Sequence, residues 1–180
     1  MGNMISENFY QGRVKNYRLD NGKNTLFFLD ITSNIISDDT GSRYAPNEVN
    51  EAVLMAIEIS KIISKIGICI LVVYQAQKLK IIDRLRRENG SLRIRCHTID
   101  SYQGGEDDVI ILCSCSYGEK VKKFIRDRRR MCVSLSRARE RLIILGELAI
   151  LKDDPSWANV LKSFAVLNNT TKRRVLIDIL

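Results

Sequence analysis

The sequence predicts a three-layer α/β fold built on a mainly parallel sheet. Short apolar runs typical of strands alternate along the chain with longer segments of helical period. Residues 68–74 (ICILVVY) are continuously apolar, a pattern typical of parallel strands that are covered on both faces. A chain of 180 residues, 45% of them apolar, is long enough to bury one such core.

In the first half, residues 25–31 (TLFFLDI) are expected to form a strand, and the polar residues 32–46 a loop. Residues 47–65 are expected to form a helix because their apolar positions recur every three or four residues. Asn47 is available as its N-cap, and Gly67 follows its end.

In the second half, residues 75–89 have a helical period. Further strands are expected at residues 93–99, 109–115 and 142–145, and a helix around Trp157 is expected to dock on the core. This pattern predicts one domain over residues 25–167. Residues 1–24 are expected to continue from an upstream region, and residues 168–180 to form a tail.

Composition excludes several classes of protein. No apolar run is long enough to span a bilayer, and the first residues lack the basic-then-apolar pattern of a secretory signal, so an intracellular protein without a membrane partner is expected. The five cysteines lack Cys-x-x-Cys spacing, and His97 is the only histidine. No metal site is therefore expected in this chain.

Charge is concentrated in one segment. Residues 120–141 contain ten lysines or arginines and two acids, which equals the net charge of +8 of the whole chain. Such a cluster attracts polyanions through phosphate contacts, so Lys122, Lys123 and Arg126 are candidate contacts to single-stranded nucleic acid. The alternative is a solvated surface run, which is the commoner role of charged stretches.

The segment 97–113 (HTIDSYQGGEDDVIILC) is the first candidate for a chemical role. Paired glycines at Gly104 and Gly105 let a backbone approach a ligand closely. The carboxylate of Glu106, just beyond them, can accept bonds from two sugar hydroxyls. A loop that merely contains glycines is the alternative.

The segment 129–146 (RRMCVSLSRARERLIILG) is the second candidate. Arg137 follows an apolar stretch, and an arginine held on a rigid element can direct a planar, permanently charged fork onto a phosphate. If the segment is helical, Arg137 and Arg141 share one face and Arg139 points elsewhere. The alternative is surface ion pairing with neighbours such as Glu140.

Together the two segments resemble motifs V and VI of superfamily 1 helicases: Tyr-Gln-Gly-x-Glu-x-Asp before an apolar strand, then Val-x-Leu-Ser-Arg-Ala-Arg before another. The likeness is greatest to the branch of the nonsense-mediated-decay helicase and the NF-X-type zinc-finger helicases. Residues 8–12 (NFYQG), 74–77 (YQAQ) and 155–157 (PSW) resemble further elements of that branch. The similarity extends over residues 8–164.

This resemblance implies the second RecA-like domain of a helicase, with a P-loop-NTPase fold that lacks the P-loop itself. It implies that Arg137 is the catalytic arginine finger on the γ-phosphate of ATP and that Glu106 holds the ribose. Gln103 and Gly104 would line the cleft between two domains. Contacts to single-stranded RNA or DNA would come from Tyr74, Thr98, Asp100 and Ser101.

The sequence departs from the family pattern in three places. Val72-Val73 replaces a Thr-Pro pair, and Gly105 occupies a position often filled by arginine. The Asn-x-x-Glu-Ala signature is imperfect, because Asn47 stands four residues before Glu51.

The phosphate-binding half of an ATPase is missing from the sequence. The only Gly-Lys pair, at residues 22–23, is followed by Asn24 and is not part of a phosphate-binding loop. Asp107 and Asp108 precede their strand, so they are not placed to bind magnesium. ATP and Mg²⁺ are therefore expected only in a complete enzyme, with the first RecA-like domain supplied by the same polypeptide or by a partner. Alone, the chain is expected to bind neither and to be inactive. A non-catalytic nucleic-acid-binding or regulatory module derived from a helicase remains the alternative.

Overall fold

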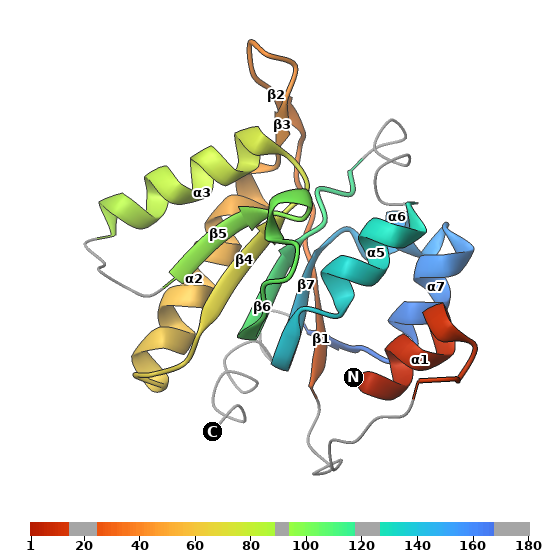
Figure 1. The fold of residues 1–180 in the computed structure, drawn as a ribbon. Coiled ribbons are helices and arrows are strands. Elements are labelled where there is room, and N and C mark those ends of the chain that lie inside the picture. Colours follow the sequence, from red (N-terminus) through yellow and green to blue (C-terminus); the bar gives the residue numbers. More distant parts are fainter. Residues whose placement is uncertain (15–24, 89–93, 118–126, 168–180) are drawn as a thin grey trace.

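A computed structural model describes residues 1–14, 25–88, 94–117 and 127–167. Its centre is a six-stranded sheet of order β5-β4-β6-β7-β1-β8 (Figure 1). All described pairings of this sheet are parallel. Its strands are β1 (Leu26–Asp30), β4 (Ile68–Val72), β5 (Ile94–Thr98), β6 (Asp107–Cys113), β7 (Ala138–Gly146) and β8 (Ala165–Leu167).

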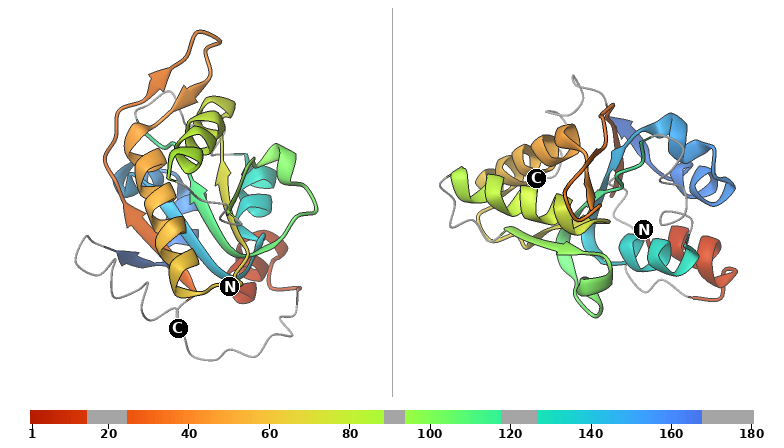
Figure 2. Two further views of the ribbon diagram at one scale, coloured as in Figure 1. Left: turned by 90° about the vertical axis from the view of Figure 1, so that its left-hand side faces the viewer. Right: turned by 90° about the horizontal axis from the view of Figure 1, so that it is seen from above.

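Helices cover both faces of the sheet, as Figure 2 shows from the side and from above. One face packs on α2 (Pro46–Ile62) and α3 (Gln75–Arg87). The other packs on α1 (Gly2–Tyr10), α5 (Arg128–Leu135), α6 (Leu148–Lys152) and α7 (Pro155–Leu161).

Neighbouring residues of each strand contribute to different cores. Phe27 and Ile70 face α2 and α3, whereas Phe28 and Leu71 face the other helices, and all four are buried. Because both faces are covered, the strands are apolar throughout rather than alternating. The predicted three-layer α/β fold is confirmed.

Two expectations before α2 were wrong. The helix begins at Pro46 and its N-cap is Ala45, because the fixed φ of proline suits the first helical position. Asn47 lies inside the helix, where its side-chain amide donates to the Thr32 carbonyl at 2.7 Å. The expected loop contains the hairpin of β2 (Ile36–Ser37) and β3 (Arg43–Tyr44).

Two strand boundaries also differ from expectation. β6 ends at Cys113, two residues early, and Cys115 beyond it has a left-handed backbone with φ 49°. β7 begins at Ala138 and contains Arg139 and Arg141. Arg137 and Arg141 therefore do not share a helical face as expected, since strand pairing with β6 continues to Ala138.

The outer helices anchor both ends of the described chain to the sheet. Met4 of α1 and Trp157 of α7 are both buried in the core on the α5 side. The expected docking helix around Trp157 is thus confirmed as α7. Over the described ranges, no helix has both the length and the apolar character needed to cross a bilayer.

Candidate functional site

The predicted site residues gather at two opposite edges of the sheet. At the carboxyl edge, Val72 pairs with Thr98, so the residues that follow β4 and β5 lie close together. Tyr74 begins α3 there as its N-cap. Thr98 donates from its hydroxyl to the Ser101 hydroxyl at 2.9 Å within the turn that contains Asp100.

The second group lies at the amino edge, where β6 and β7 begin side by side. Glu106 immediately precedes β6 and Arg137 immediately precedes β7, and the Asp107 amide donates to the Arg137 carbonyl at 3.2 Å. Gln103 and Gly104 are exposed in the same turn. Gly104 has φ +81°, a conformation that favours glycine.

Arg137 is held by three neutral acceptors. Its Nε donates to the Val133 carbonyl at 3.1 Å, and its terminal nitrogens donate to Ser136 Oγ at 3.2 Å and to the Gly105 carbonyl at 3.4 Å. These acceptors orient the guanidinium without neutralising it. The half-buried side chain thus carries a full positive charge beside the glycine turn.

Glu106 forms an ion pair with Arg139, whose Nε lies 3.4 Å from the carboxylate. The two side chains are 53% and 58% exposed, respectively, so the pair is screened by water. The pairing of β6 with β7 is irregular between Asp107 and Val109, which face Ala138 and Arg141. β7 therefore has one extra residue here, a bulge of the kind that redirects side chains next to functional sites.

The neighbouring acids do not fit a magnesium site. Asp107 is buried and its carboxylate accepts hydrogen bonds from Arg95 and from the Tyr102 hydroxyl. Burial and the bond to Asp107 raise the pKa of Tyr102. Asp108 accepts from the Gly67 amide at 2.9 Å. No group of three metal-binding side chains occurs in the part of the chain that the structure describes.

The Tyr102 ring also explains the glycine at position 105. A Cβ on Gly105 would lie 2.7 Å from that ring, which is buried and fixed by Asp107. The glycine therefore lets the turn close over the tyrosine, with its carbonyl directed at Arg137. Any larger side chain at this position would require a different placement of Tyr102.

Asp100 and Arg130 form a link that the sequence did not predict. Nε and Nη2 of Arg130 donate to the two carboxylate oxygens at 2.9 and 3.1 Å. Taken alone, residues 128–130 (RRR) are typical of a solvated surface run, but Arg130 is half-buried here. Lys122, Lys123 and Arg126 lie outside the described residues.

Glu48 is the second feature that sequence reasoning missed. Its side chain is fully buried, and burial raises its pKa to about 7. Gln77 Nε2 donates to it at 2.7 Å, and the Cys115 amide donates at 2.9 Å. A glutamate in the first turn of a helix is ordinary, because it suits the helix dipole. The sequence signal that could have indicated its burial is its place four residues before Ala52, on the buried face of α2.

A protein-family model described as an AAA domain matches residues 2–149. The chain belongs to this AAA domain family. Regulator of nonsense transcripts 1 of Dictyostelium discoideum is 29% identical over 153 residues, which cover 79% of this chain and 11% of that protein. Human NFX1-type zinc finger-containing protein 1 is 33% identical over 69 residues, which cover 38% of this chain and 4% of that protein. The chain thus spans about a tenth or less of these relatives.

Among solved structures, the AAA domain is similar to the C-terminal domain of a possible DNA helicase from Lactobacillus plantarum WCFS1. The TM-score is 0.54 at 14% identity, over 91% of this chain and 92% of that chain. This likeness supports the RecA-like fold. With the family match, it confirms the resemblance to the second RecA-like domain of superfamily 1 helicases. The roles of individual site residues stay predictions.

Proposed function

We propose that this chain is the second motor domain of an ATP-dependent RNA or DNA helicase. In this proposal it supplies Arg137 and Glu106 to ATP that a first RecA-like domain binds. The observation that carries the proposal is the placement of these two side chains at adjacent strand ends, in segments far apart in sequence. A fork of positive charge and an exposed carboxylate in one place suit a phosphate and a ribose, respectively.

Each side chain has a distinct part in this mechanism. Arg137 meets the negative charge that develops on the transferring phosphoryl group, which lowers the barrier more than it strengthens binding. Glu106 exchanges its exposed ion pair with Arg139 for ribose hydroxyls. Magnesium and the phosphate cradle belong to the first domain, which agrees with the structural contacts of Asp107 and Asp108.

The carboxyl edge is the proposed place for single-stranded nucleic acid. The hydroxyls of Thr98 and Ser101 can donate to backbone phosphates, and the Tyr74 ring offers a surface for a base. Lys122, Lys123 and Arg126 would add positive charge. A strand bound there would lie across the sheet from the nucleotide.

The proposal is tested by comparing two polypeptides, this chain alone and this chain joined to a first RecA-like domain. The chain alone is expected to fold and to hydrolyse no ATP above background, because it has no phosphate loop. The joined polypeptide is expected to show turnover that poly(U) or poly(dT) stimulates. ATP turnover by the purified chain alone would contradict the proposal that a first RecA-like domain binds the ATP. A joined polypeptide that binds poly(U) without turnover would favour the non-catalytic module.

The isolated chain is expected to bind poly(U) with an affinity that falls steeply with salt. Replacing Lys122, Lys123 and Arg126 by glutamine should reduce the slope of log K against log salt by about two, since each phosphate contact to a single strand contributes about 0.7. Fluorescence anisotropy over a salt series measures this slope.

The matched control neutralises an equal charge elsewhere, with Lys61, Lys65 and Arg86 replaced by glutamine. These exposed residues lie on and just beyond α2 and on α3. Equal slopes of log K against log salt for the two triple variants would show that Lys122, Lys123 and Arg126 are only part of a solvated surface.

A further inference from the structure

Two segments of the chain run in the same direction from one functional edge to the other. Residues 99–106 leave the carboxyl end of β5 and reach the amino end of β6 through a short 3₁₀ turn, Asp100–Tyr102 (Figure 1). α5 begins beside Asp100 and ends two residues before Arg137, at the amino end of β7. Each segment therefore has one end at each of the two edges.

These segments are tied together at both ends. At the carboxyl edge, Arg130 donates to both oxygens of Asp100 in a two-point contact. At the amino edge, Arg137 donates to the Gly105 carbonyl at 3.4 Å. Two-point contacts of this kind fix orientation as well as distance.

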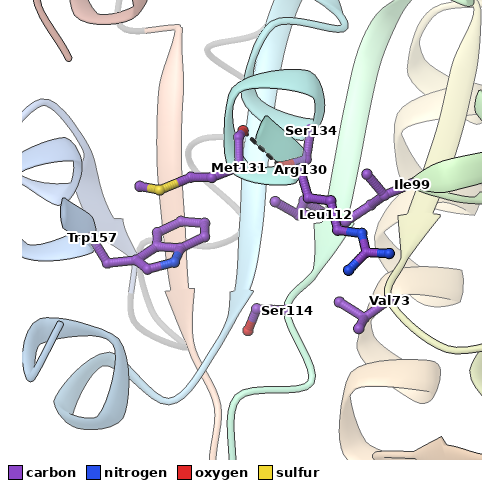
Figure 3. Close-up of a pocket in the computed structure, with 8 residues that line it drawn as sticks. All are labelled: Val73, Ile99, Leu112, Ser114, Arg130, Met131, Ser134 and Trp157. Atoms are coloured by element: carbon purple, nitrogen blue, oxygen red, sulfur yellow. Dashed lines mark hydrogen bonds between the residues drawn. The ribbon is translucent and has the colours of Figure 1, made fainter. Parts of the chain in front are cut away.

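Arg130 is fixed on its own helix as well. Asp127 caps α5, accepting from the amides of Arg129 at 2.9 Å and Arg130 at 3.3 Å, and its carboxylate lies 3.8 Å from Arg130 Nη1. Arg130 lines a small cavity between α5 and the sheet. In Figure 3 its side chain extends toward Ile99 and Val73 and away from Trp157.

We propose that Asp100 and Arg130 are a positioning pair that couples nucleic-acid binding at the carboxyl edge to the placement of Arg137 at the amino edge. This rests on the proposed function. A phosphate that binds Thr98 or Ser101 shifts the Asp100 turn, Arg130 moves with it, and α5 carries the shift to Arg137. The coupling is reciprocal, so nucleotide at Arg137 alters the affinity of the carboxyl edge in turn.

The pair gives Asp100 a different role from direct contact with nucleic acid. Its carboxylate is negative and would repel a phosphate, and both of its oxygens already accept from Arg130. The neighbouring hydroxyls of Thr98 and Ser101 are neutral, and a phosphate can accept the protons that they now donate within the turn. Asp100 is therefore a residue that acts through Arg130, not one that touches the strand.

The test uses a polypeptide that contains both RecA-like domains, with kcat for ATP measured with and without poly(U). Asp100→Asn and Arg130→Gln are each expected to lower the poly(U)-stimulated kcat about tenfold. The unstimulated kcat and the Kd for poly(U) in the absence of nucleotide should stay within about twofold, since neither residue touches a ligand. The double variant should lose no more than either single variant, because both break the same link.

Arg129→Gln is the matched control, since Arg129 is exposed on the same helix one residue away. It should retain the stimulation. Equal losses of stimulated and unstimulated kcat, additive losses in the double variant, or weaker poly(U) binding by Asp100→Asn in the absence of nucleotide would each overturn the coupling. Failure of the proposed function is a separate result, namely no ATP turnover by the parent polypeptide. The thermal midpoints of the variants verify folding; both side chains are more than a third exposed.

Discussion

Replacing Arg137 by alanine is expected to lower kcat about a thousandfold in a polypeptide with both RecA-like domains. The guanidinium is held in place by neutral acceptors from Val133, Ser136 and Gly105. In the proposed mechanism it meets charge that develops in the transition state, so its loss should affect the rate more than ATP affinity. Measuring kcat and KM for ATP at saturating poly(U) separates the two effects.

Two neighbouring substitutions serve as comparisons for Arg137→Ala. Arg139→Ala should be much milder, because it removes a surface ion pair with Glu106. Glu106→Ala should mainly raise KM, since ribose contacts are made equally before and during the reaction. A near-normal kcat for Arg137→Ala, or a larger loss of kcat for Arg139→Ala, would show that Arg137 is not the arginine finger.

The second large effect concerns stability and the buried carboxyl of Glu48. In the folded protein its pKa is raised to about 7, chiefly by burial, from its ordinary value of 4.5. Between these two values the folded protein binds more protons than the unfolded chain. Raising the pH from 4.5 to 7 should therefore lower the free energy of unfolding by about 3 kcal/mol through this group.

Glu48→Gln should remove that pH dependence, because glutamine does not titrate. The neighbouring Cys113, Cys115 and Tyr117 stay neutral in this range, since burial raises the pKa of each. The measurement is urea unfolding of the purified chain at several pH values. Losing or rearranging the hydrogen bond with Gln77 would change the free energy of unfolding by the same amount at every pH. The quantity to compare is therefore the slope of the free energy of unfolding against pH.

Glu58→Gln is the control for this experiment. Glu58 lies on the same helix and is exposed, so its replacement should keep the slope of the parent. If Glu48→Gln also keeps that slope, the carboxyl is ionised throughout the range and the hydrogen bonds outweigh its burial.

Much of the fold could be predicted from periodicity, and the exceptions have physical causes. Apolar runs located four of the six strands of the main sheet, and the shorter candidate at residues 93–99 located a fifth, β5. β8 is only three residues long and depends on pairing with β1, which local sequence does not encode. The alternation of residues 137–141 (RARER) suits a helix or a strand equally. Residues 138–141 form a strand because they pair with β6.

The two groups of site residues were predicted from the resemblance to helicase motifs, and the parallel strands place the described members of each group at a common edge of the sheet. The contacts that hold those residues were not. Asp100 and Arg130 are 30 residues apart, and Glu48 and Cys115 are 67 apart. No local pattern links such pairs. Glu48 meets Cys115 because α2 packs on one face of the sheet, and Arg130 meets Asp100 because α5 packs on the other face.

The position of β1 has a consequence for how the chain folds as it is synthesised. Leu26 pairs with Leu142, and Phe27 pairs with Ala165, so both neighbours of this strand come from the last third of the sequence. A growing chain can assemble β4, β5 and β6 while β1 still lacks both of its partners. Contacts so distant in sequence make folding slow. Until β7 has emerged from the ribosome, the apolar segment of β1 is thus unpaired in the nascent chain and prone to aggregate.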